Sequence, residues 1–201
     1  MSETPTAPAA RVPGAHIADP GPLGLAGFAL TTFVLSIVNT NIVPQALVGG
    51  ALGLALAYGG IGQFTAGVWE FAKGNTFGAT AFCSYGEFWI SFWWLAERDL
   101  GGLGPEGYKA VGAYLLAWAI FTAYMTVAAM KVNMAVLAVF VLLTITFVIL
   151  AIGWFDKESS GWIKLGGWFG LATAIVAWYA SFAGVTAFTW GRQVFPVGPR
   201  E

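Results

Sequence analysis

Long apolar runs dominate the chain, and short polar segments separate them. No Asp, Glu, Lys or Arg occurs from Pro20 to Trp69, and the segment 39-NTNIVPQ-45 divides this stretch in two. Further apolar runs cover 76–96, 110–130, 132–153 and 165–190. Because about 20 apolar residues span the hydrocarbon core of a bilayer, the pattern predicts six transmembrane helices. The runs are continuously apolar, which favours helices over the alternating strands of a membrane barrel.

Aromatic and charged residues mark the ends of the expected helices. Charges gather in the connecting segments 97–109 and 156–164. Tryptophans fall near helix ends, where an aromatic belt is expected at the membrane interface; these are Trp69, Trp93, Trp94, Trp154, Trp162 and Trp190. We therefore expect three parts: a disordered tail at 1–18, a six-helix transmembrane domain at 19–191 and a C-terminal tail at 192–201.

The orientation follows from the helix number and the basic residues. An even number of helices places both termini on the same side of the membrane. Of the nine Lys and Arg residues, five would lie on the side of the termini and four on the other. Under the positive-inside rule this weak bias predicts cytoplasmic termini for a multi-pass protein of the cell (inner) membrane.

The composition excludes several classes of protein. Only 9% of the residues are charged, compared with about 25% in soluble domains. The net charge of −1 offers nucleic acid no electrostatic attraction. A single cysteine, Cys83, and a single histidine, His16, leave no disulfide and no metal cluster. No helix interior carries a Lys or Arg, and no Ser/His/Asp set is present, so we expect no cofactor, no metal and no enzyme activity.

Polar side chains recur on single faces of the apolar helices. On the first helix Phe28, Thr32, Ser36 and Asn39 share one face, and on the third Thr80, Ser84, Glu87 and Ser91 do the same. Gln63 on the second helix and Thr122 and Thr126 on the fourth add to this set. Two interpretations stay open: hydrogen bonds between helices, or a solvated path lined by hydroxyl and amide groups.

Small residues also recur four apart on two helices. Gly49, Gly53 and Ala57 form one stripe, and Gly166, Gly170 and Ala174 form another. Such stripes let helix backbones approach closely in a bilayer, so we expect both to be packing seams.

Two motifs resemble those of the acetate uptake transporter family. The segment 19-DPGPLGL-25 is similar to the family motif Asn-Pro-Ala-Pro-Leu-Gly-Leu, with Asp19 and Gly21 as departures. It keeps the motif positions Pro20, Pro22 and Gly24. The second motif, Ser-Tyr-Gly-x-Phe-Trp, is complete at 84-SYGEFW-89. The stretch around 74-GNTFGATAF-82 and the tail 191-GRQVFPVG-198 are similar as well, so the resemblance extends over nearly the whole chain from Asp19.

The resemblance implies a pore through each protomer for acetate and related small carboxylates such as succinate, in a homohexamer within the lipid bilayer. It implies a narrow apolar point at Phe28 and Tyr85, with Leu143 matched as the third residue. A carboxylate would exchange water for protein donors along the pathway before crossing this constriction; the expected pathway residues are Leu25, Thr32, Ser36, Asn39, Gln63, Ser84 and Thr122. Without a buried cation, binding is expected at the millimolar level, about −4 kcal/mol.

Glu87 is an acid within an apolar run. It lies about 200° round the helix from Tyr85, so it faces a neighbouring helix or protomer if Tyr85 faces the pore. One interpretation is a neutral carboxyl group bonded to Ser or Thr. The other is a proton-coupling site. A direct contact with an anionic substrate is disfavoured, because an ionised carboxylate repels it.

Glu70 ends the second helix, shortly before the turn 73-KGNT-76. It could form an exposed pair with Lys73, or it could anchor the turn while Asn75 or Thr76 caps the third helix. Both roles are structural.

The residues leave other solutes open besides carboxylates. A pore of this size would also suit formate, ammonia or glycerol. The lack of a transmembrane histidine disfavours ammonia, and the lack of a pore-facing Arg disfavours glycerol. A membrane scaffold without transport activity is a further alternative.

Overall fold

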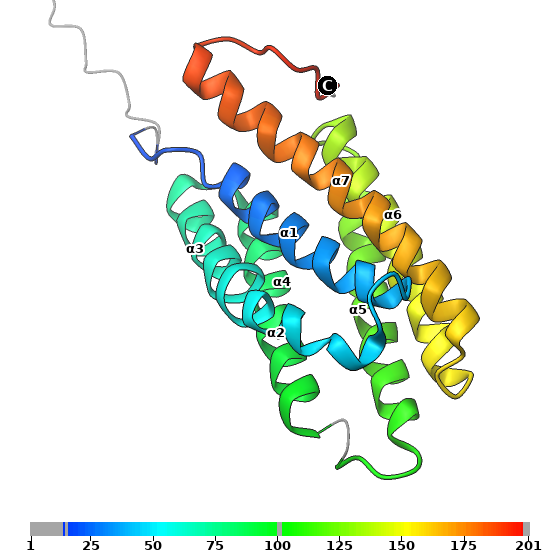
Figure 1. Cartoon of the computed structure of the whole chain (residues 1–201). Coiled ribbons are helices and arrows are strands. Elements are labelled where there is room, and N and C mark those ends of the chain that lie inside the picture. The colour runs from blue at the N-terminus through cyan, green and yellow to red at the C-terminus, as the bar shows by residue number, and fades with distance from the viewer. Residues whose placement is uncertain (1–13, 15, 100–101, 199–201) are drawn as a thin grey trace, which may run out of the picture.

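The computed structural model describes residues 14, 16–99 and 102–198, and these form a bundle of long helices (Figure 1). The helical elements in chain order are α1 (Gly21–Asn39), η1 (Gln45–Leu47), α2 (Gly49–Leu56), η2 (Ala57–Gly62), α3 (Gln63–Lys73), α4 (Thr76–Trp94), η3 (Leu95–Asp99), α5 (Gly107–Ala129), α6 (Met134–Phe155) and α7 (Ser160–Trp190).

These elements make six spans, as the sequence predicts. α2, η2 and α3 follow one another without a break and form the second span, and the predicted turn at 39–45 separates it from α1. Within the described residues, five of the six spans are long and apolar enough to cross a membrane. α4 is not among these five, and it is the helix that carries the intramembrane acid Glu87.

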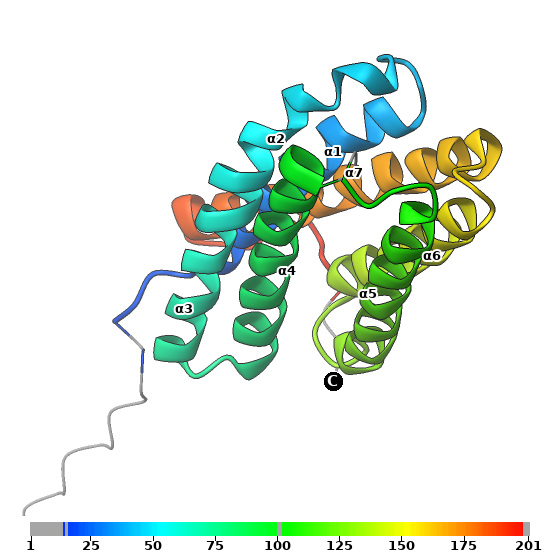
Figure 2. The same cartoon turned by 90° about the horizontal axis from the view of Figure 1, so that it is seen from below.

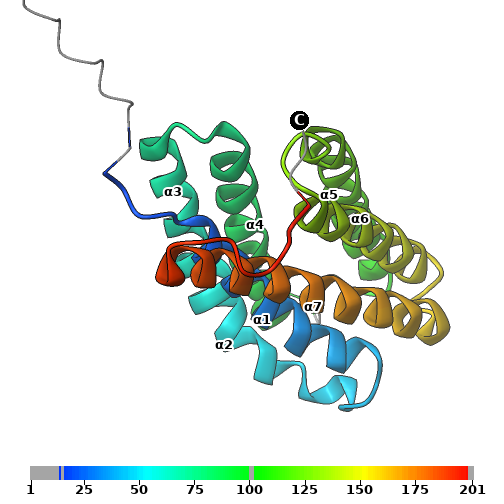
Figure 3. The same cartoon turned by 90° about the horizontal axis from the view of Figure 1, so that it is seen from above.

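The helices form three packed pairs, and one of these pairs connects the other two. α3 packs beside α4, and α5 packs beside α6. α1 and α7 pack against each other and cross one side of both pairs (Figures 2 and 3). The backbones of α4 and α5 lie farther apart than those of the paired helices, and aromatic side chains fill the space between them, as the rings of Phe88 and Trp118 do at 5.2 Å.

The second span contains a π-helical turn, η2, which the hydrophobic pattern did not predict. Gly59 and Gly60 lie in this turn and are buried. A Cβ atom at Gly59 would lie 2.6 Å from Oγ1 of Thr31, and one at Gly60 would lie 2.8 Å from a side-chain carbon of Ile90. The glycines therefore let the widened turn fit closely between α1 and α4. Single π-helical turns are rare and occur frequently at functional sites.

The stripe on α7 is a packing seam, as predicted. Gly166, Gly170 and Ala174 are all buried, and a Cβ atom at Gly170 would overlap the hydroxyl of Ser36 on α1. This close approach brings α7 against α1.

The matching stripe on the second span does not pack within the protomer. Gly49, Gly53 and Ala57 are exposed, and a Cβ atom at Gly49 or Gly53 would have no neighbour within 4 Å. The expected seam at these residues is therefore not formed inside one chain.

The family-like motif 19–25 starts α1 and fastens it to its neighbours. Pro22 lies in the first turn of α1. Proline is tolerated there because the N–H it lacks would have no acceptor within the helix. Its carbonyl oxygen accepts a hydrogen bond from Ser181 of α7 at 2.7 Å. Gly24 faces α4, because a Cβ atom there would lie 2.6 Å from the ring of Phe82.

The C-terminal segment packs back onto the bundle as far as Gly198. The carbonyl oxygens of Val197 and Gly198 accept hydrogen bonds from the backbone N–H groups of Ala135 and Met134, at 3.1 and 2.9 Å. These are among the first N–H groups of α6, which have no partner within the helix. Residues 192–198 are thus not a free tail, and 199–201 lie outside the described residues.

The described ends of the chain lie at the same end of the bundle (Figure 1). This arrangement agrees with an even number of spans. The tail expected at 1–18 lies almost entirely outside the described residues.

Candidate functional site

Two cavities enter the bundle. The first, which we call the Asn39 cavity, has a volume of about 210 Å³ and reaches from the end of α1 to Phe28. Its mouth includes Gln45 and Glu158, at the end of the bundle where α1 ends and α7 begins. The polar groups deeper in its lining come from four helices and include Thr32, Ser36, Asn39, Trp89, Tyr114 and Thr146.

The second cavity, which we call the Glu70 cavity, has a volume of about 230 Å³. It lies at the end of the bundle where α1 begins and α3 ends, and the C-terminal segment forms part of its lining. Its polar lining residues are Asp19, Glu70, Asn75, Asn133 and Gln193.

The two cavities approach each other along α1 and α6 but share no lining residue among those that the structure describes. On α1, Leu25 lines the Glu70 cavity, and Phe28 lines the Asn39 cavity. On α6, Phe140 lines the Glu70 cavity, and Leu143 lines the Asn39 cavity. A spacing of three residues is about one helical turn, so on each helix the boundary between the cavities is a single turn thick.

Tyr85 of α4 lies at this boundary. Ala81, four residues earlier, lines the Glu70 cavity, and Phe88, three residues later, lines the Asn39 cavity. The Tyr85 ring lies 5.8 Å from the ring of Phe28 and 6.0 Å from that of Phe140, and the residue is 3% exposed. We call Phe28, Tyr85, Phe140 and Leu143 the wall, because they separate the two cavities.

The hydroxyl group of Tyr85 is held by α5. Its oxygen lies 2.9 Å from Oγ1 of Thr122. Thr122 itself donates to the carbonyl oxygen of Trp118 at 2.7 Å. A threonine hydroxyl has one hydrogen, so Tyr85 is the donor of the bond between the two side chains. The ring of Tyr85 is thereby fixed in the wall.

The cavities divide the expected pathway residues into two groups. Thr32, Ser36 and Asn39 line the Asn39 cavity, and Leu25 lines the Glu70 cavity. Gln63, Ser84 and Thr122 line neither cavity. Gln63 is 1% exposed, Ser84 is half-buried, and Thr122 supports the wall through Tyr85.

Glu87 lies on the outer face of α4. It is exposed and lines neither cavity. Ser91, one turn further along, is also exposed and forms a hydrogen bond with the hydroxyl of Tyr114 at 2.8 Å. The face that carries Glu87 therefore points away from both cavities, as the angle to Tyr85 predicts.

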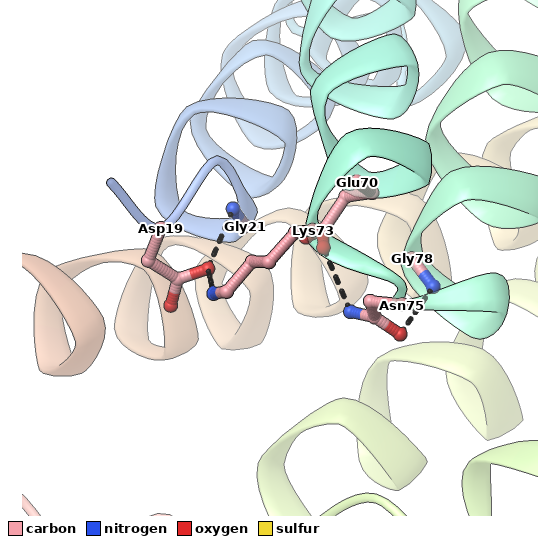
Figure 4. Close-up of polar contacts among 6 residues, drawn as sticks. All are labelled: Asp19, Gly21, Glu70, Lys73, Asn75 and Gly78. Atoms are coloured by element: carbon pink, nitrogen blue, oxygen red, sulfur yellow. Dashed lines mark hydrogen bonds and ion pairs between the residues drawn. The ribbon is translucent and has the colours of Figure 1, made fainter. Parts of the chain in front are cut away.

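Glu70 anchors the turn between α3 and α4 (Figure 4). Nδ2 of Asn75 donates to Oε2 of Glu70 at 2.9 Å, and the backbone N–H of Asn75 donates to the carbonyl oxygen of Glu70 at 2.9 Å. Oδ1 of Asn75 accepts from the N–H of Gly78 at 3.1 Å and so caps α4. Asn75 is thus the capping residue, and Thr76 is the first residue of the helix.

The exposed pair of Glu70 with Lys73, one of the two alternatives, does not form. Glu70 is 1% exposed, and Lys73 instead pairs with Asp19 at 2.7 Å (Figure 4). The same Asp19 oxygen accepts from the N–H of Gly21 at 3.2 Å. The departure at Asp19 from the family motif thus supplies a carboxylate for Lys73.

Acidic groups, and no basic ones, line the described parts of both cavities. Glu158 lies in the Asn39 cavity, and Asp19 and Glu70 lie in the Glu70 cavity. None of the described lining residues is Lys, Arg or His. An anion in either cavity would therefore be held by neutral donors alone.

Several lining residues were not predicted from the sequence. Trp89 belongs to the motif 84–89 but was not named as a site residue, and Phe140 of the wall lies on a helix without a sharp motif. Gln193 and Val197 line the Glu70 cavity from a segment that was expected to be a tail. The motif itself was the available signal for Trp89.

Six helical spans with two opposed internal cavities define a multi-pass membrane protein. The chain belongs to the GPR1/FUN34/yaaH family, whose pattern matches residues 2–190.

Relatives of known name cover most of the chain. It is 42% identical over 189 residues to the ammonia transport outward protein 2 of Saccharomyces cerevisiae, an alignment that covers 88% of this chain and 64% of that protein. It therefore spans slightly less than two thirds of the length of that yeast relative. It is 39% identical over 183 residues to the succinate-acetate/proton symporter SatP of Escherichia coli K12, covering 90% of this chain and 96% of that one.

A solved structure has the same fold. The structure of the bacterial acetate channel SatP matches with a TM-score of 0.84 at 38% identity, over 90% of this chain and 99% of that chain. The all-helical architecture predicted from the apolar runs is confirmed.

Proposed function

We propose that this chain carries acetate and related small carboxylates, including succinate, across the cell (inner) membrane. The observation that carries the proposal is the wall: two cavities from opposite ends of the bundle stop within one helical turn of each other on α1 and on α6. A solute has to displace only a thin layer of apolar side chains to pass from one to the other. The constriction of Phe28, Tyr85 and Leu143 implied by the family resemblance belongs to this layer.

The lining favours weak binding and fast release. A carboxylate in the Asn39 cavity would exchange water for the hydroxyl groups of Thr32 and Ser36, and then cross the wall. Since none of the described lining residues is basic, the anion is not trapped by a fixed positive charge. Conduction requires a site that the solute can leave, and millimolar affinity, about −4 kcal/mol, meets this need.

The relatives support a carboxylate as the solute. The SatP proteins bear the names of an acetate channel and a succinate-acetate/proton symporter. The yeast relative is named for ammonia, which makes ammonia the second candidate. The lack of a transmembrane histidine in this chain disfavours it.

From the resemblance we infer a homohexamer in which each protomer has its own pathway. The even number of spans and the weak bias of the Lys and Arg residues favour cytoplasmic termini. In this arrangement the Glu70 cavity opens to the cytoplasm. The protein needs no cofactor and catalyses no reaction.

The deciding experiment is uptake of labelled acetate into liposomes that contain the purified protein, with and without an inward proton gradient. Uptake driven by the gradient, after subtraction of the leak of acetic acid into empty liposomes, indicates proton coupling. Uptake that follows the membrane potential alone indicates an anion channel. Equal uptake by protein-containing and empty liposomes would refute the proposal, and labelled methylammonium would then test the second candidate.

A further inference from the structure

Residues 192–198, which we call the strap, form one side of the Glu70 cavity. The strap follows α7 and returns across the end of the bundle to the start of α6 (Figure 3). Gln193 and Val197 of the strap line the cavity. No part of the strap is helix or strand, so it can move without unwinding regular structure.

The other sides of the cavity mouth are helix ends that side chains hold in place. Asp19 lies before α1, Asn75 before α4 and Asn133 before α6, and all three line the cavity. Asn75 caps α4, and the side chain of Asn133 caps α6. Asp19 forms the ion pair with Lys73. Moving any of these would break a helix cap or an ion pair, so the strap is the side of the mouth that opens most easily.

Two contacts fasten the strap to α7. The hydroxyl of Tyr179 donates to the carbonyl oxygen of Pro196 at 2.6 Å. The ring of Phe195 lies 4.6 Å from that of Phe182. Both α7 residues are exposed on the surface of the helix, so the strap rests on an outer face and is not inserted into the core.

The end of the strap is fastened to α6 through the two backbone hydrogen bonds to Met134 and Ala135. Gly198 has a positive φ of 64°, and a Cβ atom there would lie 2.7 Å from Cγ of Met134. If the strap lifts, the two N–H groups of α6 lie at the end of the bundle, where water can replace their partners. Opening therefore leaves no buried donor unsatisfied.

The polar side chain that the strap presents to the cavity is bonded to the strap itself. Nε2 of Gln193 donates to the carbonyl oxygen of Phe195. Because this bond lies within the strap, the Gln193 side chain can leave the cavity together with it.

We propose that the strap is a lid on the Glu70 cavity, which lifts from α6 and α7 to admit a solute at the end of the bundle where the described chain ends lie. This inference goes beyond the proposed function, because it concerns access to the cavity and not the identity of the solute that crosses the wall. The open state is populated according to the free energy of the few contacts that it breaks. Loops that close a site in this way commonly control entry and release.

The test measures how fast a cysteine inside the cavity reacts with a cationic methanethiosulfonate reagent in the detergent-solubilised full chain. The reporter is Ala81→Cys, in a chain whose single cysteine has been removed by Cys83→Ala. Ala81 lines the Glu70 cavity and is 2% exposed. The wall closes the route from the Asn39 cavity, so the reagent has to pass the strap. Leu25→Cys, on α1 in the same cavity, is a second reporter.

Two substitutions loosen the lid at its two attachments. Tyr179→Phe removes the hydroxyl that holds Pro196. Gly198→Ala strains a positive φ and brings a Cβ atom against Met134. If opening is fast, the labelling rate is proportional to the population of the open state. Each substitution is expected to raise this rate about fivefold at both reporters, which corresponds to about 1 kcal/mol.

Matched controls lie away from the strap. Tyr124→Phe removes a hydroxyl from the exposed face of α5. Gly104→Ala imposes the same kind of strain at a φ of 72°, where a Cβ atom would have no neighbour within 4 Å. Both are expected to leave the labelling rate unchanged.

The lid is refuted if Tyr179→Phe and Gly198→Ala label no faster than these controls. It is also refuted if deletion of residues 192–201 leaves both reporters as slow as in the full chain. Because labelling in detergent involves no transport, the lid and the proposed carboxylate transport can fail independently of each other.

Discussion

The hydroxyl oxygen of Tyr85 lies 2.9 Å from Oγ1 of Thr122, and this hydrogen bond joins α4 to α5 at the level of the wall. Trp118 and Phe121 of α5 also pack against the Tyr85 ring, with ring centres 6.1 and 5.4 Å away. The hydrogen bond and these ring contacts together hold the Tyr85 ring between the two cavities. Thr122 was expected to line the pathway, whereas in the structure it supports a residue of the wall.

Replacement of Thr122 by valine should loosen the wall without changing the shape of the core. Hydrogen bonds between membrane helices contribute about 0.6 kcal/mol on average, so a small loss of stability is expected. The hydroxyl group of Tyr85 loses its partner and the ring is held less firmly in the wall, so uptake of succinate relative to acetate should rise. Thr126→Val serves as the control, because Thr126 lies one turn away and bonds to Thr144 instead. An unchanged uptake ratio in Thr122→Val would count against a role for this bond in selectivity.

Leu143→Ala should widen the wall directly. The side chain is 4% exposed, and truncation of a buried leucine typically lowers the free energy of unfolding by about 2–5 kcal/mol. Larger carboxylates such as lactate should then enter more readily, measured as the ratio of lactate to acetate uptake in proteoliposomes. Leu116→Ala, on the exposed face of α5, provides the control. Equal ratios in the two variants would show that Leu143 does not limit passage.

Asn75→Ala should destabilise the turn between α3 and α4. Loss of an N-cap side chain lowers stability by about 1 kcal/mol, and the buried carboxyl of Glu70 loses its amide partner, which adds about 1–3 kcal/mol. Thermal unfolding in detergent measures the combined loss of stability from both effects. Thr76→Ala, at the exposed neighbouring position, is expected to change stability by less than about 0.5 kcal/mol. A comparable loss in both variants would mean that the cap and the Glu70 bond contribute little.

Glu87→Gln should leave the pH dependence of acetate uptake unchanged. Glu87 is exposed on the outer face of α4 and lines neither cavity, so its proton is not on the route between them. The measurement is the initial rate of acetate uptake over a range of acidic to neutral pH. A shifted pH profile in this variant would instead support the proton-coupling hypothesis, with the proton moving along the outer face of the protomer.

The sequence by itself determined the spans and the orientation of single helix faces. Continuously apolar runs of about 20 residues indicate membrane-spanning helices, and six such runs predicted six spans with both termini on the same side. A period of 3.6 residues placed Phe28, Thr32, Ser36 and Asn39 on one face, and all four line the Asn39 cavity. It also turned Glu87 away from Tyr85.

Only the tertiary structure decided which neighbour each face meets. Gly49, Gly53 and Ala57 have the same spacing as Gly166, Gly170 and Ala174, yet the first stripe is exposed and the second is buried against neighbouring helices. Spacing along one helix gives the direction of a side chain but not the partner it reaches, because that partner lies on a helix distant in sequence. For the same reason the C-terminal lining of the Glu70 cavity emerges only from the packed structure.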